Sequence, residues 1–247
     1  MRVLFLGTSG STFDRGNMPS SILIDGDMLF DCPAPCPYEL SRRNVPVEKL
    51  TVFLTHLHAD HSLGLLDLAW HLWISQKGPI DVYVPRGAEG ELEKLVASLH
   101  REKAGQLLGA FNVTPVEPGD LIGEVEVVEA SHPVPAVGYV VRRGGRSLCY
   151  TGDTSPLPTH VEAFRGCGLL VHEATYPPGM EEEAVADGHS TPVQAARTAL
   201  AAGVDRLALV HIPTARLGWS VREEYVAAAA KIFSRVSAPL GGEEYIL

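Results

Sequence analysis

Four side chains of the types that bind metal ions stand within six positions of the segment 51–64, TVFLTHLHADHSLG. A short apolar run at 52–54 leads through Thr55 into these residues, His56, His58, Asp60 and His61. Side chains two apart on an extended backbone point the same way, so His56 and His58 can reach one ion. Asp60 and His61 come where the chain turns towards a helix, and their different direction suits a second ion. Imidazole and carboxylate groups suit zinc and, less selectively, manganese or iron. The segment therefore predicts a metal site rather than a polar turn with three solvated histidines.

The same pattern recurs further along the chain, where apolar runs typical of strands end at a histidine or an aspartate. His132 follows the run 125–128, Asp153 follows 148–151 and His211 follows 206–210. Taken alone, each would be a hydrogen-bonded loop residue, but their shared position after a strand favours a common site. The seven residues divide into two sets of three with one carboxylate left to bridge: His56, His58 and His132; Asp60, His61 and His211; and Asp153. A bridging carboxylate lowers the repulsion between two cations that lie ~3.5–4 Å apart.

Strand and helix patterns alternate throughout the chain, without a Pro/Ser-rich linker. Further strands are expected at 3–6, 22–24, 28–30, 80–84, 137–141 and 169–171, and helices at 64–76, 88–99 and 192–202. The turns Asp25-Gly26-Asp27 and 143–146 predict hairpins. Thr191 and Gln194 form a capping-box pattern, and Gly203 is the stop signal of that helix. This alternation predicts a single α/β domain over residues 1–247, with the site along the strand ends.

The composition excludes several classes of function. The 247 residues are 45% hydrophobic, which is ample for a core, and the net charge is −10 with no run of basic residues. A large nucleic-acid footprint is therefore not expected, because phosphate contacts need clustered lysine and arginine. No stretch approaches 18 uninterrupted apolar residues, so no membrane partner is expected, and MRVLFLG at the start indicates a strand rather than a signal peptide. We expect a cytoplasmic protein.

The four cysteines, Cys32, Cys36, Cys149 and Cys167, form no CxxC motif and are expected to be free thiols. A pairing or metal-binding role of Cys32 and Cys36 is disfavoured, because prolines stiffen their segment.

Several other histidines and acidic residues near the motifs are not expected to bind metal directly. His71 is expected to be structural within its helix, and His100 lies on a predicted surface helix without chemistry. His172-Glu173 is not a zincin motif, because Tyr176 stands where its second histidine would be. Asp31 is either a loop carboxylate or a hydrogen-bond acceptor behind the 56–61 segment.

The pattern His56-x-His58-x-Asp60-His61, followed by His132, Thr151-Gly152-Asp153-Thr154 and His211, resembles the metallo-β-lactamase superfamily. This resemblance implies an αβ/βα sandwich of two mixed sheets flanked by helices, with a dinuclear metal site at one edge. Further motifs are similar to those of the ribonuclease Z-like branch: Phe5-Leu6-Gly7-Thr8, Asn17 with Ser20-Ser21, Phe30-Asp31-Cys32, His172-Glu173-Ala174-Thr175 and His189-Ser190-Thr191. Together the motifs run from residue 4 to about 212.

The chain departs from that branch in three places. Pro33-Ala34-Pro35-Cys36-Pro37 replaces a Gly-rich segment, and residues 212–216 differ from the usual serine-rich form. The branch also carries a long basic arm between the counterparts of His132 and Asp153, where this chain has room only for a strand hairpin. Structured tRNA is therefore not the expected substrate, unless Arg142, Arg143 and Arg146 replace the arm.

The resemblance implies two divalent ions, with zinc expected and manganese or iron as alternatives. Two such ions lower the pKa of a bridging water to about 7, which serves hydrolysis of phosphodiesters, lactones and thioesters alike. We expect a phosphodiesterase for a small or flexible substrate, with the helix that begins after Thr191 offering its amides to an anionic group. A lactone, thioester or other ester hydrolase and a metal-binding protein without activity are the alternatives, and a homodimer is compatible with all three.

Catalytic roles fall to Asp60, His189 and Glu173. His189 matches the family's HST signature and is the expected general acid, with Glu173 supporting its protonated form. The plainer reading is that His189 only hydrogen-bonds a loop near the helix start.

Overall fold

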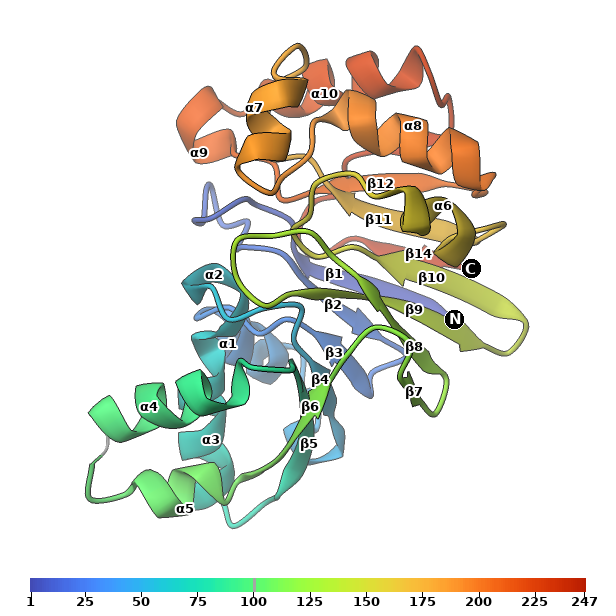
Figure 1. Cartoon of the computed structure of the whole chain (residues 1–247). Helices are drawn as coiled ribbons and strands as arrows, with labels where there is room; N and C mark the ends of the chain where they lie inside the picture. Colours follow the sequence, from blue (N-terminus) through green and yellow to red (C-terminus); the bar gives the residue numbers. More distant parts are fainter. Residues whose placement is uncertain (100) are drawn as a thin grey trace.

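Two seven-stranded sheets pack face to face in the computed structural model, which describes residues 1–99 and 101–247 (Figure 1). His100 lies outside the described residues. The first sheet has the order β14 (Glu244–Ile246), β1 (Arg2–Gly7), β2 (Ser21–Ile24), β3 (Met28–Phe30), β4 (Thr51–Phe53), β5 (Ile80–Pro85) and β6 (Phe111–Val116). The second has the order β13 (Val236–Ser237), β12 (Leu207–Val210), β11 (Leu169–Glu173), β10 (Arg146–Tyr150), β9 (Val137–Arg143), β8 (Val125–Glu129) and β7 (Leu121–Ile122).

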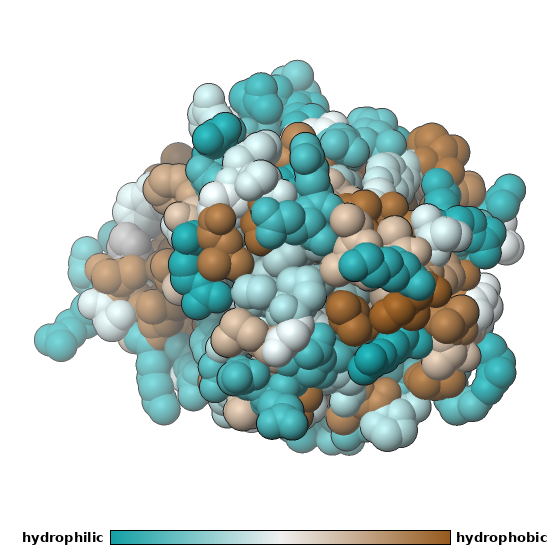
Figure 2. All heavy atoms as spheres, turned by 90° about the horizontal axis from the view of Figure 1, so that it is seen from above, coloured by the Kyte–Doolittle hydropathy of each residue, from teal (hydrophilic) through white to brown (hydrophobic). Residues whose placement is uncertain are grey.

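Helices cover the outer side of each sheet. On the side of the first sheet lie α1 (Cys36–Arg42), α2 (Ala59–Ser62), α3 (Gly64–Ile74), α4 (Glu89–Leu99) and α5 (Ala104–Leu108), with a 3₁₀ turn at Val47–Lys49. On the side of the second lie α6 (Pro158–Ala163), α7 (Glu181–Ala186), α8 (Pro192–Ala202), α9 (Thr214–Leu217) and α10 (Val221–Ala230). The expected αβ/βα sandwich is confirmed. Hydrophilic and hydrophobic side chains are mixed over the face seen from above (Figure 2).

Both sheets change from antiparallel to parallel pairing at a strand that leads into the predicted site. β1, β2 and β3 pair antiparallel, and β3, β4, β5 and β6 pair parallel. In the second sheet β7 to β10 pair antiparallel, and β10 to β13 pair parallel. The carboxyl ends of the parallel strands meet at one edge of each sheet. The residues that follow β3, β4, β10, β11 and β12 are therefore brought together.

The expected hairpins connect antiparallel neighbours. Asp25 and Gly26 both have positive φ, 50° and 84°, which matches the tight turn between β2 and β3. Gly144 and Gly145, with φ of 59° and 72°, link β9 to β10. That hairpin occupies nearly the whole segment between His132 and Asp153, as expected.

The core between the sheets is anchored by aromatic rings close to the predicted metal loop. Phe30 stacks on Phe53 with ring centroids 5.0 Å apart, and Tyr139 meets Phe53 edge to face at 5.5 Å. The Tyr139 hydroxyl donates a hydrogen bond of 2.6 Å to the Leu54 carbonyl. Burying each large side chain contributes about 1.5–3 kcal/mol. The second sheet is thus fixed to the end of β4, directly before the residues of the predicted metal site.

All four cysteines are buried free thiols, as expected. Cys32 supports the metal-binding segment through its backbone, because its N–H donates to the His61 carbonyl at 2.7 Å and its carbonyl accepts from Gly64 N–H at 2.8 Å. His71 is exposed and lies on the outer face of α3, away from the buried side of the helix. Among the described residues, none of the helices combines the length and the apolar character that crossing a membrane requires.

His160 on α6 makes folding sensitive to acid. Its ring is buried against Phe164, its Nε2–H donates to the Glu129 carbonyl at 2.8 Å, and burial lowers its pKa from the ordinary 6.5 to about 4. As pH falls below 6.5 the unfolded chain takes up this proton and the folded chain does not, so stability falls until pH 4. Replacing His160 with Gln should therefore reduce the loss of unfolding free energy between pH 7 and pH 5 by about 2 kcal/mol.

Denaturant titrations at the two pH values would measure the difference. His71→Gln, which removes an exposed histidine, is the control and should leave the pH dependence as in the parent chain. An unchanged pH dependence in His160→Gln would contradict the assignment.

Candidate metal centre

The first predicted set of donor atoms converges at the edge of the two sheets. His56 Nε2 lies 3.0 Å from His58 Nδ1, and His132 Nε2 lies 3.2 Å from the same atom. His56 and His58 follow β4 in the first sheet, whereas His132 follows β8 in the second. The three nitrogens lie close enough together to hold one ion between them.

The second predicted set also converges. Asp60 Oδ2 lies 3.1 Å from His211 Nε2 and 3.5 Å from His61 Nε2. Asp60 and His61 belong to α2, and His211 follows β12. His211 has a φ of 56°, a conformation that costs a non-glycine residue about 1–3 kcal/mol and that turns its ring back over the strand end.

Asp153 lies between the two sets. Its Oδ2 is 3.9 Å from His56 Nε2, 3.5 Å from His61 Nε2 and 3.4 Å from His211 Nε2. The other oxygen, Oδ1, is buried and has no hydrogen-bond partner in the described part of the chain. This is the position that a bridging carboxylate needs.

Hydrogen bonds fix four of the histidines in the tautomer that presents Nε2 to the centre. His61 Nδ1 lies 2.8 Å from a carboxylate oxygen of Asp31, and His132 Nδ1 lies 2.9 Å from the Gly188 carbonyl. Both acceptors require Nδ1 to carry the proton. The Nδ1 atoms of His56 and His211 face the hydroxyls of Thr55 and Thr175, at 3.1 and 2.9 Å.

Each of these hydroxyls donates to a carboxylate, Thr55 to Asp31 and Thr175 to Glu173, so each accepts from its histidine. The Nε2 lone pairs of His56, His61, His132 and His211 are therefore all free to bind a metal.

Electrostatics keeps both carboxylates and two of the histidines in their metal-binding forms, whereas the neighbouring carboxylates raise the pKa of His61 and His211, whose protons a bound cation would displace. Burial opposes ionisation of Asp60 and Asp153, but the neighbouring histidines outweigh it and hold the pKa of both carboxyls well below the usual range. Burial lowers the pKa of His56 and of His132, which favours the neutral rings. Deprotonated carboxylates and neutral imidazoles are the forms that bind divalent ions.

The donor set fits a metal ion rather than a hydrogen-bonded cluster. His61 Nε2, like Asp153 Oδ1, is buried and lacks a partner among the described residues. An orphaned buried polar group costs about 1–3 kcal/mol, a cost that a bound cation would remove. A set of imidazole and carboxylate donors matches zinc, with manganese or iron less selectively held.

Asp31 fills the second of the two roles considered for it. It is fully buried behind the metal-binding segment, where it accepts hydrogen bonds of 2.8 Å from Thr55 N–H, from the His61 ring and from the Tyr150 hydroxyl. Its φ of 58° turns the side chain back towards β4. No sequence motif points to Thr55 and Tyr150, because their roles depend on Asp31 being buried between them.

Glu173 organises the other side of the centre. Its Oε1 accepts from Thr154 N–H at 3.0 Å and lies 2.8 Å from His189 Nδ1, and its Oε2 accepts from Thr175 N–H at 2.9 Å. Burial lowers the pKa of His189, but the Glu173 carboxylate outweighs it and raises that pKa to about 9. One carboxylate thus orients His189 directly and His211 through Thr175.

The predicted anion contact at the start of α8 is wrong. The capping box is present, with Thr191 Oγ1 accepting from Gln194 N–H at 3.2 Å and Gln194 Oε1 accepting from Thr191 N–H at 2.8 Å. These bonds use the amides of Thr191 and Gln194, Thr191 and Pro192 are buried, and residues 191–194 are not among those that line the cavity beside the metal centre. The helix start supports the loop of His189 from behind.

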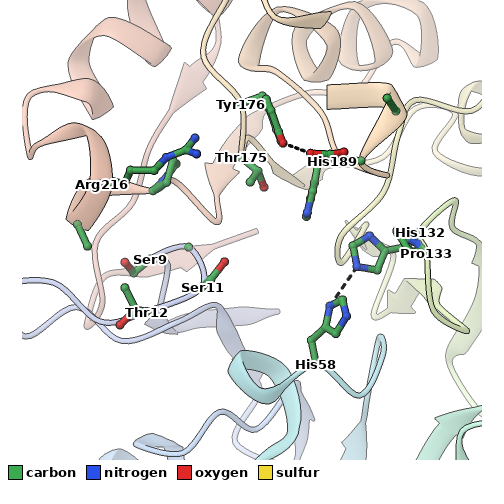
Figure 3. Close-up of a pocket in the computed structure, with 15 residues that line it drawn as sticks. Ser9, Ser11, Thr12, His58, His132, Pro133, Thr175, Tyr176, His189 and Arg216 are labelled. Atoms are coloured by element: carbon green, nitrogen blue, oxygen red, sulfur yellow. Dashed lines mark hydrogen bonds between the residues drawn. The ribbon is translucent and has the colours of Figure 1, made fainter. Parts of the chain in front are cut away.

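A cavity of about 540 Å³ opens beside the centre (Figure 3). His58, His132 and His189 line it on one side, and the segments 9–12 and 213–216 contribute to its other side. Tyr176 and Asp187 also line it. Tyr176 donates a hydrogen bond to Asp187 at the edge of the cavity. A volume of this size suits a compact ligand.

A family model described as a β-lactamase superfamily domain matches residues 28–212, which includes all seven predicted donor residues. The chain belongs to this superfamily. Within it, the chain is 30% identical to ribonuclease Z of Halobacterium salinarum, over 88% of this chain and 89% of the relative. That alignment runs over 278 positions, more than the 247 residues of this chain, so the relative carries segments that this chain lacks.

Solved structures of the superfamily share the fold. The metallo-β-lactamase fold protein YhfI from Bacillus subtilis superposes with a TM-score of 0.85 at 22% identity, covering 99% of both chains. The short form of human tRNase Z superposes with a TM-score of 0.79 at 24% identity, covering 100% of this chain and 99% of that one. Superfamily membership and a donor set fitted to divalent ions identify the chain as a metal-dependent hydrolase.

Proposed function

We propose that the chain is a dinuclear metal-dependent phosphodiesterase that acts on a small or flexible phosphodiester. The observation that carries the proposal is that His58 and His132 of the donor set line the same cavity as His189. Its volume of about 540 Å³ suits a compact substrate. The name of the relatives, ribonuclease Z, supports phosphodiesters over other esters.

The donor residues have distinct places in this proposal. His56, His58 and His132 would hold one ion, Asp60, His61 and His211 the other, and Asp153 would contact both. When bound, the ions would supply Lewis-acid stabilisation of charge on the phosphoryl oxygens and would lower the pKa of water. Asp60 Oδ2 lies 3.1 Å from His211 Nε2, so both atoms would bind the second ion, and Asp60 is proposed as a catalytic residue through the ion that it would hold.

His189 is proposed as the general acid. Cleavage of a phosphodiester expels an alkoxide, which leaves poorly unless it is protonated as the bond breaks. The His189 ring borders the cavity, and Glu173 holds its Nδ1, so Nε2 is the atom that can give up a proton to the leaving group (Figure 3). The Glu173 carboxylate favours the protonated ring that this role requires.

A substrate panel tests the reaction class. We expect the metal-loaded chain to turn over bis(p-nitrophenyl) phosphate and dinucleotides faster than lactones or thioesters, by kcat/KM. Faster turnover of a lactone or thioester would assign the centre to an ester hydrolase instead. No turnover of any substrate, with metal bound, would support a metal-binding protein without activity.

Two metal ions per chain are expected in protein purified without added metal. Elemental analysis by mass spectrometry should give close to two equivalents, mostly zinc, because six donor groups form two sets of three and Asp153 lies between them. Asp153→Ala should lower the content of both ions, whereas His71→Ala, on the exposed face of α3, should keep it. A content near zero that neither zinc nor manganese restores would contradict the prediction.

Weak or absent processing of precursor tRNA is the third expectation for this function. The hairpin of β9 and β10 takes the place where the related branch carries its arm, and the net charge is −10. Two arginines of this hairpin are not available to bind RNA phosphates in place of the arm, because they form salt bridges. Arg142 pairs with Glu126, and Arg143 pairs with Asp27 and Glu124.

Cleavage of a precursor tRNA at its 3′ end, followed by gel electrophoresis at physiological salt, would measure this activity. Efficient cleavage there would overturn the prediction.

The homodimer stays a prediction, which sedimentation velocity would check.

A further inference from the structure

The wall of the cavity that faces the histidines is built from hydroxyl groups and one guanidinium. Ser9, Ser11 and Thr12 come from the loop after β1, and Arg216 comes from α9 (Figure 3). His58 and His132 lie across the cavity from these four residues. The metal centre and this wall are therefore at opposite ends of one binding space.

Arg216 supplies the positive charge of this wall of the cavity. Among the described residues that line the cavity, it is the sole lysine or arginine. It forms no salt bridge within the described part of the chain, although the chain carries 30 acidic residues. An arginine that faces a cavity without a partner is suited to bind an anionic group.

Ser9 supplies a second, independent sign of a ligand. Its side chain is 1% exposed, lines the cavity, and its Oγ has no hydrogen-bond partner among the described residues. A buried hydroxyl normally finds a partner, because leaving it unsatisfied costs about 1–3 kcal/mol.

The wall is held rigidly. Ser9 N–H donates to the Met18 carbonyl, and Gly10 N–H donates to the Ile212 carbonyl, both at 3.0 Å. A Cβ on Gly10 would lie 3.3 Å from Pro213 Cα, so the loop packs directly against the segment that leads to Arg216. The same segment begins at His211, which fixes the wall relative to the metal centre.

We propose that this wall is a second anion subsite, which binds a non-scissile phosphate of the substrate while the scissile phosphodiester lies at the metal centre. The inference rests on the proposed phosphodiesterase function and narrows it to compact phosphodiesters that carry one additional phosphate.

Acidic residues near the cavity limit the number of phosphates that a bound substrate can carry. Asp187 lines it, and Glu181, Glu182 and Glu183 precede it on α7. A continuing nucleic-acid backbone would bring further phosphates towards these carboxylates, whereas one extra phosphate can be satisfied by Arg216 alone. The charge distribution therefore favours a small molecule over a polymer.

Two chromogenic substrates test the subsite. Thymidine 5′-(p-nitrophenyl phosphate) has only the scissile phosphodiester, and its 3′-phosphorylated form adds the second phosphate with the same leaving group. We expect the metal-loaded parent chain to prefer the 3′-phosphorylated substrate by at least ~10-fold in kcat/KM. Arg216→Gln should lower this preference ~10–100-fold, mainly through KM, and Ser9→Ala should lower it several-fold. Arg216→Lys should retain part of the preference, because it keeps the charge without the fork of donors.

Arg146→Gln, which removes an exposed arginine from the β9–β10 turn, is the matched control and should leave the preference unchanged. Metal content is measured for each variant, so that damage to the centre is recognised. If the parent chain hydrolyses both substrates equally, or Arg216→Gln keeps the preference, the subsite is refuted while the phosphodiesterase function stands. If the parent chain hydrolyses neither, the proposed function itself fails.

Discussion

Replacing His189 with Ala is expected to slow hydrolysis of a substrate with a basic alkoxide leaving group by ~10²–10⁴-fold in kcat. The loss should be much smaller with p-nitrophenolate, which leaves without being protonated. Bound metal should stay the same, because Glu173 rather than an ion holds His189 Nδ1. Steady-state kinetics on the two substrates, with elemental analysis of the same preparations, would measure all three quantities.

Glu173→Gln sharpens this test. It keeps an oxygen that can accept from His189 Nδ1 but removes the negative charge that favours the protonated ring. Its effect should therefore also depend on the leaving group, in the same direction as that of His189→Ala. Equal losses on both substrates in His189→Ala, or loss of metal, would remove His189 from the role of acid. It would then be a residue that only supports the loop.

Replacing Gly152 with Ala is expected to damage both folding and activity. Gly152 has a φ of 57°, and a Cβ there would lie 2.6 Å from the Cβ of Thr55. The backbone conformation alone costs alanine about 1–2 kcal/mol, and displacing a packed neighbour adds about 1–3 kcal/mol. Thr55 holds Asp31 and His56 in place, so a shift there should also lower kcat/KM by at least ~10²-fold.

Gly144→Ala is the matched control for this prediction. Gly144 has nearly the same φ, 59°, but a Cβ there would have nothing within 4 Å. It should lose about 1–2 kcal/mol of unfolding free energy and keep its activity. Denaturant titration and kinetics of both variants separate backbone strain from the clash. If Gly152→Ala lost no more than Gly144→Ala, Thr55 would have no part in holding the centre.

Much of the fold and of the donor set could be predicted because the signals are local. Apolar runs that end at His132, Asp153 and His211 mark strands and their carboxyl ends, and parallel pairing brings such ends together. The single-domain organisation expected for residues 1–247 stays a prediction. The role of Asp31 could not be settled from sequence, because it depends on a left-handed backbone and on the burial of Thr55 and Tyr150 against it.

Tertiary packing decides several features that the sequence alone cannot show. The capping box predicted for α8 is confirmed, yet the amides of Thr191 and Gln194 bond to each other's side chains rather than to a ligand, because the helix start is buried. The arginines of the β9–β10 hairpin look basic in sequence, but Arg142 and Arg143 are neutralised by carboxylates from β8, the turn before it and the β2–β3 turn. Arg216, in contrast, is an isolated arginine in sequence, and only the fold shows that it faces the cavity.

Each set of donor atoms draws on both sheets: His132 meets His58 from 74 positions away, and His211 meets Asp60 from 151 positions away. Neither half of the chain can therefore assemble an ion site by itself. During synthesis, the chain would gain high metal affinity only after Ile212 has left the ribosome and the two sheets have packed together. Metal binding would then stabilise only the fully folded chain, because an ion that binds the completed sandwich and not the unfolded chain adds RT ln(1 + [metal]/Kd) to the free energy of unfolding. In a cell short of metal, the apo chain would be a more frequent target for proteases, and the abundance of the protein would follow the supply of the ion.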